Sequence, residues 1–323
     1  MFKSCWRFID MRHIRMIDDC LKREFPDLIA EDKIGQGVSG SVWLVHMKGG
    51  QYVIKWIASN MHPKEPVDCK LSDLSESFIG AEWLQFLNFN SSHIIHSHYA
   101  IFWDHSRKAF RTMDRNQVEE IITNPALLNG NCFSLYGIIS EYIENVETLG
   151  EYIQRKNHFS SEELIFFGYQ MLLGVNDLNA ERVMHRDIKP ENILVQGERG
   201  LILIDFGCAR LIPEKMGNVI KRGGSYLGTI PYMAPEIRYF HDGSLCYDHL
   251  SDVYSIFAIL YYMGSGQHVD EVDSIEPFLS TCDEKFADLL RKMGRSEPFE
   301  RISAEVAIGH PVFKKVQDIL SIK

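Results

Sequence analysis

Four residues that can do chemistry lie close together in one part of the chain. The stretch "HRDIKPEN", residues 185–192, contains the acid Asp187, the amine Lys189 and the carboxamide Asn192, and a second acid, Asp205, follows in "IDFG". Such side chains normally stay in water, yet the neighbouring segments "ILVQ" and "LILIDF" have the composition of buried strands. Polar groups held between apolar strands indicate a functional site.

A glycine-rich turn and a lysine form a second candidate site nearer the N-terminus. Gly35, Gly37 and Gly40 stand in "GQGVSGSV", between two predicted strands. Glycines let backbone N–H groups approach a polyphosphate closely, although a plain glycine-rich hairpin is the alternative. A strand follows the turn, which argues against a dinucleotide-binding fold. Lys55, in "YVIK", would need an anionic partner if it were buried, and an edge lysine that reaches solvent is the alternative.

The overall composition excludes several classes of protein. The 323 residues carry a net charge of −10, which argues against nucleic acid as a partner. The seven cysteines form no CxxC pair and are odd in number, which argues against a disulfide framework and a zinc site. We therefore expect a reducing compartment, the cytoplasm, with the nucleus as the alternative. The apolar runs are too short to span a bilayer, and the N-terminus lacks the pattern of a signal peptide.

The periodicity of the chain changes from strands to helices. Residues 1–29 have helical spacing and predict an N-terminal helical extension that ends at Pro26. Strand patterns dominate 30–143, with strands expected over 41–47, 51–57 and 94–103. They are interrupted by one helical stretch, 71–89, and by a long polar segment, 104–131, which we interpret as a surface insertion. Helical periodicity dominates 144–323, as in 160–180. We expect an α+β protein with a small sheet lobe, a larger helical lobe and a cleft between them.

The motifs resemble those of the eukaryotic-type protein kinase domain. A glycine-rich hairpin, a strand lysine, "HRDIKPEN", "DFG" and "APE" occur in the order and rough spacing of that family, over about residues 30–315. The resemblance implies a bilobal fold with a small antiparallel-sheet N-lobe, one main helix and a mostly helical C-lobe. It also implies that ATP and Mg²⁺ are bound and that a phosphoryl group passes to serine or threonine hydroxyls of protein substrates.

The resemblance assigns roles in phosphoryl transfer. Asp187 would orient the substrate hydroxyl, and Lys189 would offset charge on the γ-phosphoryl group. Asn192 and Asp205 would supply oxygen ligands for Mg²⁺. Thr229, in "GTIPYMAPE", would bond Asp187 and Lys189, whereas an ordinary turn threonine is the alternative.

The resemblance also assigns the nucleotide pocket. Lys55 would hold the α- and β-phosphates and pair with a helix glutamate, for which we choose Glu82 over the rival Glu76. Ser140 would limit access behind the adenine. The other residues expected to line the pocket are Gly35, Gly37, Gly40, Val42, Val53, Glu141, Ile143, Glu147 and Leu194.

Two further expectations concern regulation and substrate choice. Arg186 resembles the arginine that binds a phosphate on the activation loop, and Ser225 stands at the usual spacing for the phosphosite; a loop ordered by its own contacts is the alternative. Glu147 and Glu191 resemble positions that read basic residues before the phosphoacceptor, although both could simply face water.

Other matching residues look architectural. Glu236 of "APE" and Arg301 resemble a buried ion pair, and Asp252 resembles the acid that bonds the backbone of the catalytic loop. Phe257 departs from the family, which usually has glycine there, so either the helix must make room or its neighbours must be smaller. Cys208 and His185 are interpreted as packing residues.

Alternatives to an active protein kinase remain open. A pseudokinase would keep the fold and serve as a binding scaffold, but intact Lys55, Asp187, Asn192 and Asp205 argue against it. A small-molecule kinase of related fold is the other enzyme class, and the "GTIPYMAPE" segment argues against that. Residues 1–29 and 104–131 lie outside the family pattern and could bind a regulatory partner or merely cover surface.

Overall fold

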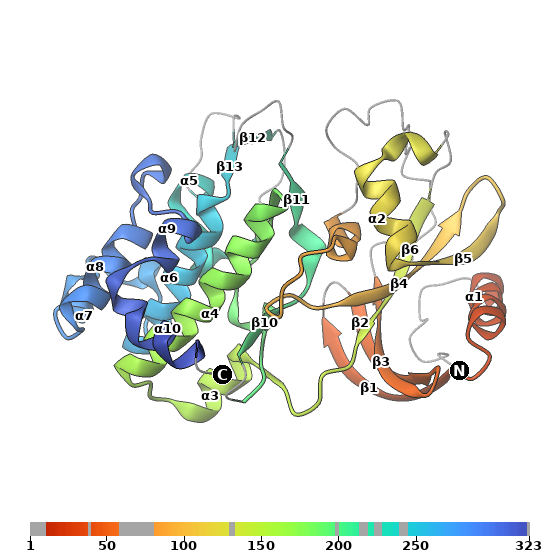
Figure 1. The fold of residues 1–323 in the computed structure, drawn as a ribbon, viewed down its shortest axis with the longest axis horizontal. Helices are drawn as coiled ribbons and strands as arrows, with labels where there is room; N and C mark the ends of the chain where they lie inside the picture. Colours follow the sequence, from red (N-terminus) through yellow and green to blue (C-terminus); the bar gives the residue numbers. More distant parts are fainter. Residues whose placement is uncertain are drawn as a thin grey trace. The chain divides into compact units, whose positions relative to one another are not determined.

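The structure is a computed structural model that describes residues 11–37, 40–57, 81–128, 133–197, 200–212, 219–222, 228–238 and 245–321. The chain divides into two compact units (Figure 1). The sheet unit comprises Met1–Asn88 and Ile95–Ile143, and the helical unit comprises Phe89–Ile94 and Glu144–Lys323. The α+β architecture expected from the sequence, with an antiparallel sheet followed by a helical part, is confirmed.

The sheet unit is built on six antiparallel strands in the order β1-β2-β3-β6-β4-β5. Alternation of β-branched or aromatic residues with polar ones favours strands in these segments. Their bounds are β1 Ile29–Gly37, β2 Gly40–Met47, β3 Gly50–Ile57, β4 Ser97–Asp104, β5 Ala109–Asp114 and β6 Phe133–Glu141. The remaining elements of the unit are α1 Met11–Glu24, α2 Arg115–Thr123 and two 3₁₀ helices, η4 Ala81–Phe86 and η5 Pro125–Leu128.

Successive side chains on β3 point to opposite faces of the sheet, which separates its core from its candidate site. Ile54 and Trp56 belong to one apolar cluster, whereas Val53 and Lys55 point the other way. Helix α1 covers the Ile54 face with the apolar residues Ile17, Cys20 and Leu21, and Phe25 follows directly after the helix. These four side chains are at most 2% exposed, so the extension is an integral part of the core.

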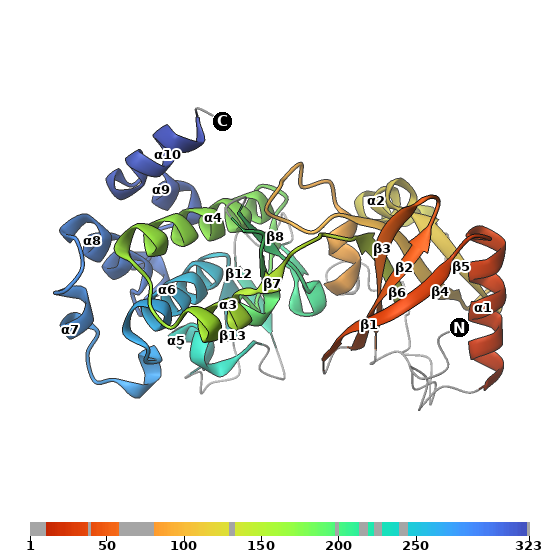
Figure 2. The ribbon, with the colours of Figure 1, turned by 90° about the horizontal axis from the view of Figure 1, so that it is seen from below.

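The polar segment expected as a surface insertion has regular structure. Residues 109–114 form β5, which adds a strand at the edge of the sheet beside β4. Asp114 then caps α2 through a capping box with Gln117, with both hydrogen bonds 3.0 Å long. Helix α1 lies against β5 (Figure 2). The two segments outside the family pattern therefore pack against each other.

Of two expectations about the chain before β4, one is wrong in its starting residue and the other concerns a segment that is only partly described. A strand was expected from Ile94, but β4 begins at Ser97, because residues 89–94 bond to the helical unit instead. The amide of Leu203 donates to the carbonyl of His93 at 2.8 Å, and Ile94 forms a bridge with Leu203. Of the helix expected over 71–89, only the part from residue 81 is described, as η4, and Glu76 lies outside the described residues.

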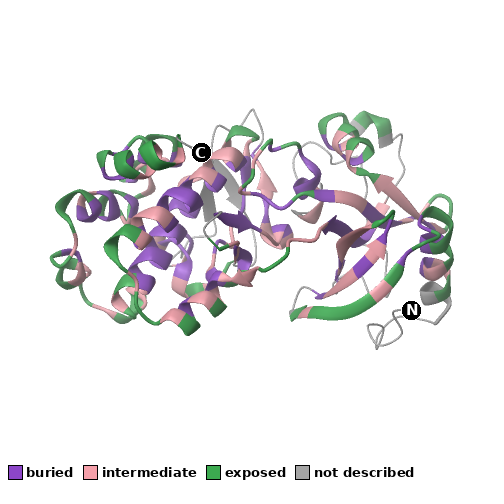
Figure 3. Cartoon of the chain, turned by 60° about the horizontal axis from the view of Figure 1, so that its bottom comes forward, coloured by how far each residue is buried: buried purple, intermediate pink, exposed green. Residues whose placement is uncertain are grey.

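The helical unit is organised around two apolar helices, α4 Ser161–Ala180 and α6 Leu250–Ser265, which pack on each other. Figure 3 shows buried residues along these helices and exposed residues along the outer ones. The outer helices are α3 Leu149–Lys156, α5 Pro235–Arg238, α7 Glu276–Leu279, α8 Glu284–Met293, α9 Ala304–Ile308 and α10 Lys314–Leu320. No helix among the described residues is long and apolar enough to cross a membrane.

Short strands of the helical unit frame the motif loops. They are β7 Glu147–Thr148, β8 Val183–Met184, β9 Ile193–Val195, β10 Leu201–Leu203, β11 Arg210–Leu211, β12 Val219–Arg222 and β13 Leu245–Asp248. Strand β9 pairs with both β10 and β7, and β8 pairs with β11. Between them lie the short 3₁₀ helices η6 Pro190–Asn192 and η7 Phe206–Cys208, which carry the ends of the two motifs. The remaining short turns are η9 Ile230–Tyr232, η10 Val269–Glu271, η11 Pro298–Glu300 and η12 Pro311–Phe313.

Phe257, the departure from the family pattern, is accommodated by a glycine opposite it. The ring is 1% exposed within α6. A Cβ placed on Gly294 would lie 2.6 Å from this ring, which is too close for any side chain. The large residue on α6 is thus matched by the smallest residue on the segment after α8, as expected.

The expected buried ion pair of the helical unit is also confirmed. Arg301 forms two parallel hydrogen bonds to the carboxylate of Glu236, at 2.8 and 2.9 Å. The same guanidinium donates to backbone carbonyls, including that of Arg295, and lies 5.1 Å from the ring centre of Tyr254. The Arg301 side chain is 0% exposed, so this pair holds α5 against the segment before α9.

Candidate active site

The loop that carries the first motif is held from below by an acid on α6. Asp252 is fully buried and accepts the backbone N–H groups of His185 and Arg186 at 2.8 and 2.9 Å. Burial raises the pKa of Asp252, and the two N–H groups oppose this effect. Arg186 has a φ of 65°, a conformation uncommon for a residue with a side chain. The role expected of Asp252 is therefore confirmed.

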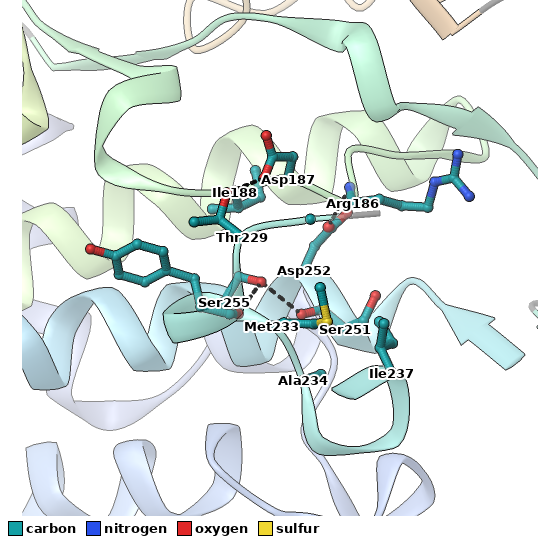
Figure 4. Close-up of a pocket in the computed structure, with 12 residues that line it drawn as sticks. Arg186, Asp187, Ile188, Thr229, Met233, Ala234, Ile237, Ser251, Asp252 and Ser255 are labelled. Carbon is teal, nitrogen blue, oxygen red and sulfur yellow. Dashed lines mark hydrogen bonds between the residues drawn. The ribbon is translucent and has the colours of Figure 1, made fainter. Parts of the chain in front are cut away.

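Asp187 is the centre of a compact hydrogen-bond network, of which Figure 4 shows Asp187 and Thr229. Its Oδ2 accepts from Lys189 Nζ at 2.7 Å and from Asn192 Nδ2 at 3.1 Å. Its Oδ1 accepts from Thr229 Oγ1 at 2.8 Å, and Lys189 Nζ also donates to that hydroxyl at 3.0 Å. Both carboxylate oxygens are thus oriented by neighbours, and the structure contains the two contacts expected of Thr229.

The segment that presents Thr229 is itself fastened to α6. Ser255 Oγ donates to the carbonyl of Tyr232 at 2.8 Å and to that of Ser251 at 3.2 Å. These residues line a small pocket between the motif loop, residues 228–237 and α6 (Figure 4). The arrangement holds Thr229 and Asp187 in a fixed relation within one unit.

Asn192 and Asp205 have the oxygen atoms that a magnesium ion prefers. Asn192 is 5% exposed, and its Nδ2 donates to the Asp187 carbonyl at 2.9 Å, which leaves Oδ1 as the acceptor of the amide. The amide of Ile204 donates to the Asn192 carbonyl at 2.9 Å and so joins the two motifs. Asp205 follows in a left-handed conformation, with φ 62°, and its Oδ1 accepts from Gly207 N at 3.2 Å.

This donor set fits Mg²⁺ better than a metal enclosed by protein ligands. The described residues contain no cluster of three or more His, Cys, Asp or Glu side chains suited to a metal. Magnesium binds through one or two carboxylates together with phosphates and water, so one carboxylate and one carboxamide are sufficient.

The residues expected to regulate the site are only partly described. Arg186 Nε donates to the carbonyl of Cys208 at 2.6 Å, directly after the second motif. Ser225 lies outside the described residues. Burial raises the pKa of the Cys208 thiol to about 11, which leaves little reactive thiolate and agrees with a packing role.

Two residues expected at the nucleotide have local contacts in the helical unit. Leu194 lies on β9, half-buried, between Thr148 of β7 and Ile202 of β10. Glu147 pairs with Arg155 at 2.6 Å, so its carboxylate already has a cationic neighbour. An incoming ribose or basic peptide would have to compete with that arginine.

The phosphate-side residues form a row across the sheet unit. Gly35 on β1 pairs with Val42 on β2, which in turn pairs with Lys55 on β3. Directly paired residues point to the same face of a sheet, so Val42 and Lys55 share one face, and Val53 lies two positions along it. Gly37 and Gly40 close the β1–β2 hairpin as partners, with Gly40 at φ 149°.

A chain of buried polar groups places η4 on this same face. Ser140 pairs with Val53, and its Oγ lies 3.0 Å from Ser97 Oγ, which donates to Gln85 Oε1 at 2.9 Å. Since Gln85 belongs to η4, the segment with Glu82 covers the face of Val53 and Lys55, opposite α1. The choice of Glu82 as the lysine's partner agrees with this placement.

The end of β6 is where the adenine-binding backbone was expected, and Glu141 is ordered there by His96. The Glu141 carboxylate accepts the N–H of His96 at 2.8 Å, and the Glu141 N–H donates to the His96 carbonyl at 3.0 Å. Ile143 is the last residue of the sheet unit.

Sequence reasoning missed several residues that order this unit. Gln85 and Ser97 link η4 to the sheet, and Arg115 of α2 contacts the ring of His96 and the carbonyl of Leu87. None of these belongs to a family motif, and their partners lie far away in sequence. Only the odd placement of an arginine at the first position of α2 was a local signal, because the helix dipole disfavours a cation there.

Comparison with known proteins agrees with this geometry. The family model for the protein kinase domain matches residues 28–313. A probable serine/threonine-protein kinase of Dictyostelium discoideum is 28% identical over 232 residues, which cover 65% of this chain and 48% of that protein. Mouse serine/threonine-protein kinase Nek3 is 30% identical over 182 residues, covering 52% of this chain and 34% of its own length.

The chain spans less than half the length of these relatives. A second Dictyostelium kinase is 27% identical over 226 residues, 62% of this chain and 26% of that protein. The similarity therefore concerns the domain that contains the glycine-rich hairpin, the strand lysine and the Asp187 network. On the family match over most of its length, this chain belongs to the protein kinase family.

Proposed function

We propose that the chain is an active serine/threonine protein kinase that transfers the γ-phosphoryl group of ATP to hydroxyls of protein substrates with Mg²⁺. The observation that carries this proposal is the Asp187 carboxylate, oriented on one oxygen by Thr229 and on the other by Lys189 and Asn192. A scaffold without turnover would not require this arrangement.

Each part of the network has a role in the transfer. Asp187 accepts a hydrogen bond from the substrate hydroxyl and orients its oxygen toward the γ-phosphorus. Lys189 places a positive charge where negative charge develops on the transferred group. Thr229 keeps both side chains in place from the substrate-binding segment. Most of the catalysis is therefore positioning and charge stabilisation.

Asn192 and Asp205 would hold magnesium through Oδ1 and the carboxylate. Bound there, the ion would neutralise charge on the nucleotide phosphates. In the sheet unit, Lys55 would bind the α- and β-phosphates with Glu82 as its partner, and the Gly35–Gly40 hairpin would cover them. Val42, Val53 and Leu194 would contact the adenine, the backbone at Glu141 and Ile143 would bond it, and Glu147 would reach the ribose.

The preference for serine and threonine rests on the Lys189–Thr229 pair and on the names of the relatives, which are serine/threonine kinases. We further propose that phosphorylation at Ser225 regulates the enzyme through Arg186, and that Glu191 favours basic residues before the phosphoacceptor. Glu147 contributes less to that preference because Arg155 is its neighbour. We place the enzyme in the cytoplasm, and residues 1–29 or 104–131 are where a regulatory partner would bind.

The decisive experiment measures transfer of labelled phosphate to a generic basic protein. We expect Asp187→Asn to lower the rate by roughly 10²–10⁴-fold, the range for a misplaced proton acceptor, and Asp205→Ala to abolish magnesium-dependent turnover. Asp318→Asn, a change at an exposed acid on α10, is the control and should leave the rate unchanged. Phosphoamino-acid analysis of the product then tests the serine/threonine preference. Wild-type protein that binds ATP without any transfer would instead support a scaffold.

A further inference from the structure

The end of the Glu82 segment is fastened by two residues of the inserted helix α2. Arg115 donates to the carbonyl of Leu87, and the carboxylate of Glu119 accepts the N–H of Asn88 at 3.2 Å. Arg115 and Glu119 are four positions apart, so they lie on one face of α2. One helix face thus supplies a donor and an acceptor to two consecutive residues that directly follow η4.

Helix α2 is anchored well enough to act as a fixed support. Its N-terminus is closed by the Asp114–Gln117 capping box, and the face that carries Arg115 and Glu119 also buries Val118 and Ile122. Helix α2 packs on η4, β4 and β5. The segment with Glu82 therefore rests on an element that is held independently by apolar contacts and by its own cap.

Arg115 is placed where a helix disfavours it. It is the first residue of α2, at the positive end of the helix dipole, and the first turn contains no acid. Burial lowers the pKa of its guanidinium, and nearby Glu119 and Glu141 oppose this effect. The position is explained by the side-chain contacts of Arg115 rather than by the stability of α2.

A second contact of Arg115 leads to the predicted adenine-binding backbone. Its guanidinium contacts the ring of His96, whose backbone exchanges two hydrogen bonds with Glu141. Burial and the positive charge of Arg115 lower the pKa of His96, which favours the neutral form of the ring, the form that can accept a hydrogen bond. Arg115 therefore touches both the Glu82 segment and the support of Glu141.

We propose that Arg115, together with Glu119, is a positioning residue for the nucleotide site. It holds the Glu82 segment in the place where Glu82 meets Lys55, and it holds His96 so that the Glu141 backbone meets the adenine. The proposal deepens the proposed function and rests on it, since it assigns the inserted helix to the ATP site of the kinase.

The first test compares variants on the two faces of α2. We expect Arg115→Gln to lower kcat/KM for ATP roughly 10-fold, because small misplacements of catalytic groups have effects of this size or larger. Arg115→Lys should recover only part of the loss, since an ammonium cannot bond the Leu87 carbonyl and His96 in the guanidinium geometry. Glu119→Gln should lower kcat/KM, whereas the same change at the neighbouring exposed Glu120 should have no effect.

The second test separates positioning from stability. In a double-mutant cycle with Glu82→Gln, the Arg115→Gln effect should largely disappear, because residues that act through one another are not additive. Additive losses, equal effects of Glu119→Gln and Glu120→Gln, or a lower melting temperature with unchanged kinetics would overturn the proposal. If the wild type transfers no phosphate, the proposed function fails, and affinity for an ATP analogue becomes the readout. Weaker binding of the analogue by Arg115→Gln, with unchanged binding by Glu120→Gln, would then support positioning. Unchanged binding by Arg115→Gln would refute it.

Discussion

The two units order their candidate site residues in different ways. In the helical unit, Asp187, Lys189 and Asn192 come from one short loop and bond each other. Thr229 reaches Asp187 from a distant segment, and Asp252 holds the backbone of the two residues before Asp187. In the sheet unit, the residues of the row around Lys55 are separated in sequence and are aligned by strand register. A site built within one loop depends on a few hydrogen bonds, whereas one built across strands depends on everything that supports the sheet.

The supports of the sheet unit include two segments that contain none of the family's motifs. Helix α1 covers the Ile54 face with Ile17 and Leu21, and the insertion adds β5 beside β4 and α2 beside η4. The helical unit instead keeps the expected supports, Asp252 and the Glu236–Arg301 pair. These segments thus stabilise the unit whose site is assembled from distant residues.

The largest expected effect on stability lies in the helical unit. Glu236→Gln should destabilise it by about 3–5 kcal/mol, because it leaves the fully buried Arg301 without its carboxylate. Urea unfolding followed by fluorescence would measure this loss. Glu297→Gln, an acid on a nearby turn with no described side-chain bond, is the control. A loss below about 1 kcal/mol, as surface pairs show, would mean that the pair is solvated.

A comparable but smaller loss is expected in the sheet unit, where α1 meets the sheet. Ile17→Ala should cost about 2–5 kcal/mol, since it removes a fully buried side chain from the cluster around Trp56. Ile29→Ala, at a 60% exposed position on β1, serves as the matched control and should change little. Equal unfolding midpoints for the two variants would show that α1 is not part of the core.

The contact between Phe257 and Gly294 tests how closely the helical unit is packed. Gly294→Ala should destabilise the helical unit by about 1–3 kcal/mol, since the new methyl group would meet the ring. Phe257→Leu in the same chain should recover part of the loss, because a smaller side chain makes room. Thermal unfolding of the wild type, the two single variants and the double variant measures the coupling energy between the two positions. This coupling would vanish if the ring simply moved aside.

The last effect we predict is a dependence of the stability of the sheet unit on pH. Burial lowers the pKa of His98 from 6.5 to about 4, and His96 and Arg115 act in the same direction. The His98 ring therefore binds a proton less readily in the folded unit than in the unfolded chain. The contribution of the neutral ring to stability is present above pH 6.5 and is lost as the pH falls from 6.5 toward 4.

Unfolding free energies of wild type and His98→Gln over this pH range would measure the effect. The difference between the two proteins should change with pH between 6.5 and 4 and be constant above 7. The neighbour Tyr52 meets the His98 ring edge-on. A constant difference at all pH values would show that His98 keeps its ordinary pKa.

Much of the fold was predictable because local patterns and tertiary structure agree. The strands at 41–47 and 51–57 were expected within one residue of β2 and β3, and α4 was expected from its apolar periodicity. The insertion was not predictable as β5 and α2, since its polar composition conceals a strand that is stabilised by pairing with β4. Likewise, nothing local indicated that His93 would bond Leu203 and so delay the start of β4.

By itself, the sequence determined the family and the chemistry of the Asp187 loop, because residues a few positions apart in one turn must lie close together. It also determined which residues of β3 face away from the core, since side chains alternate along a strand. Only the tertiary structure decided that Gln85, Ser97 and Ser140 form one buried chain, that α1 meets β5, and that Arg115 reaches Leu87. Each of these contacts joins elements whose separation along the chain leaves no local pattern to read.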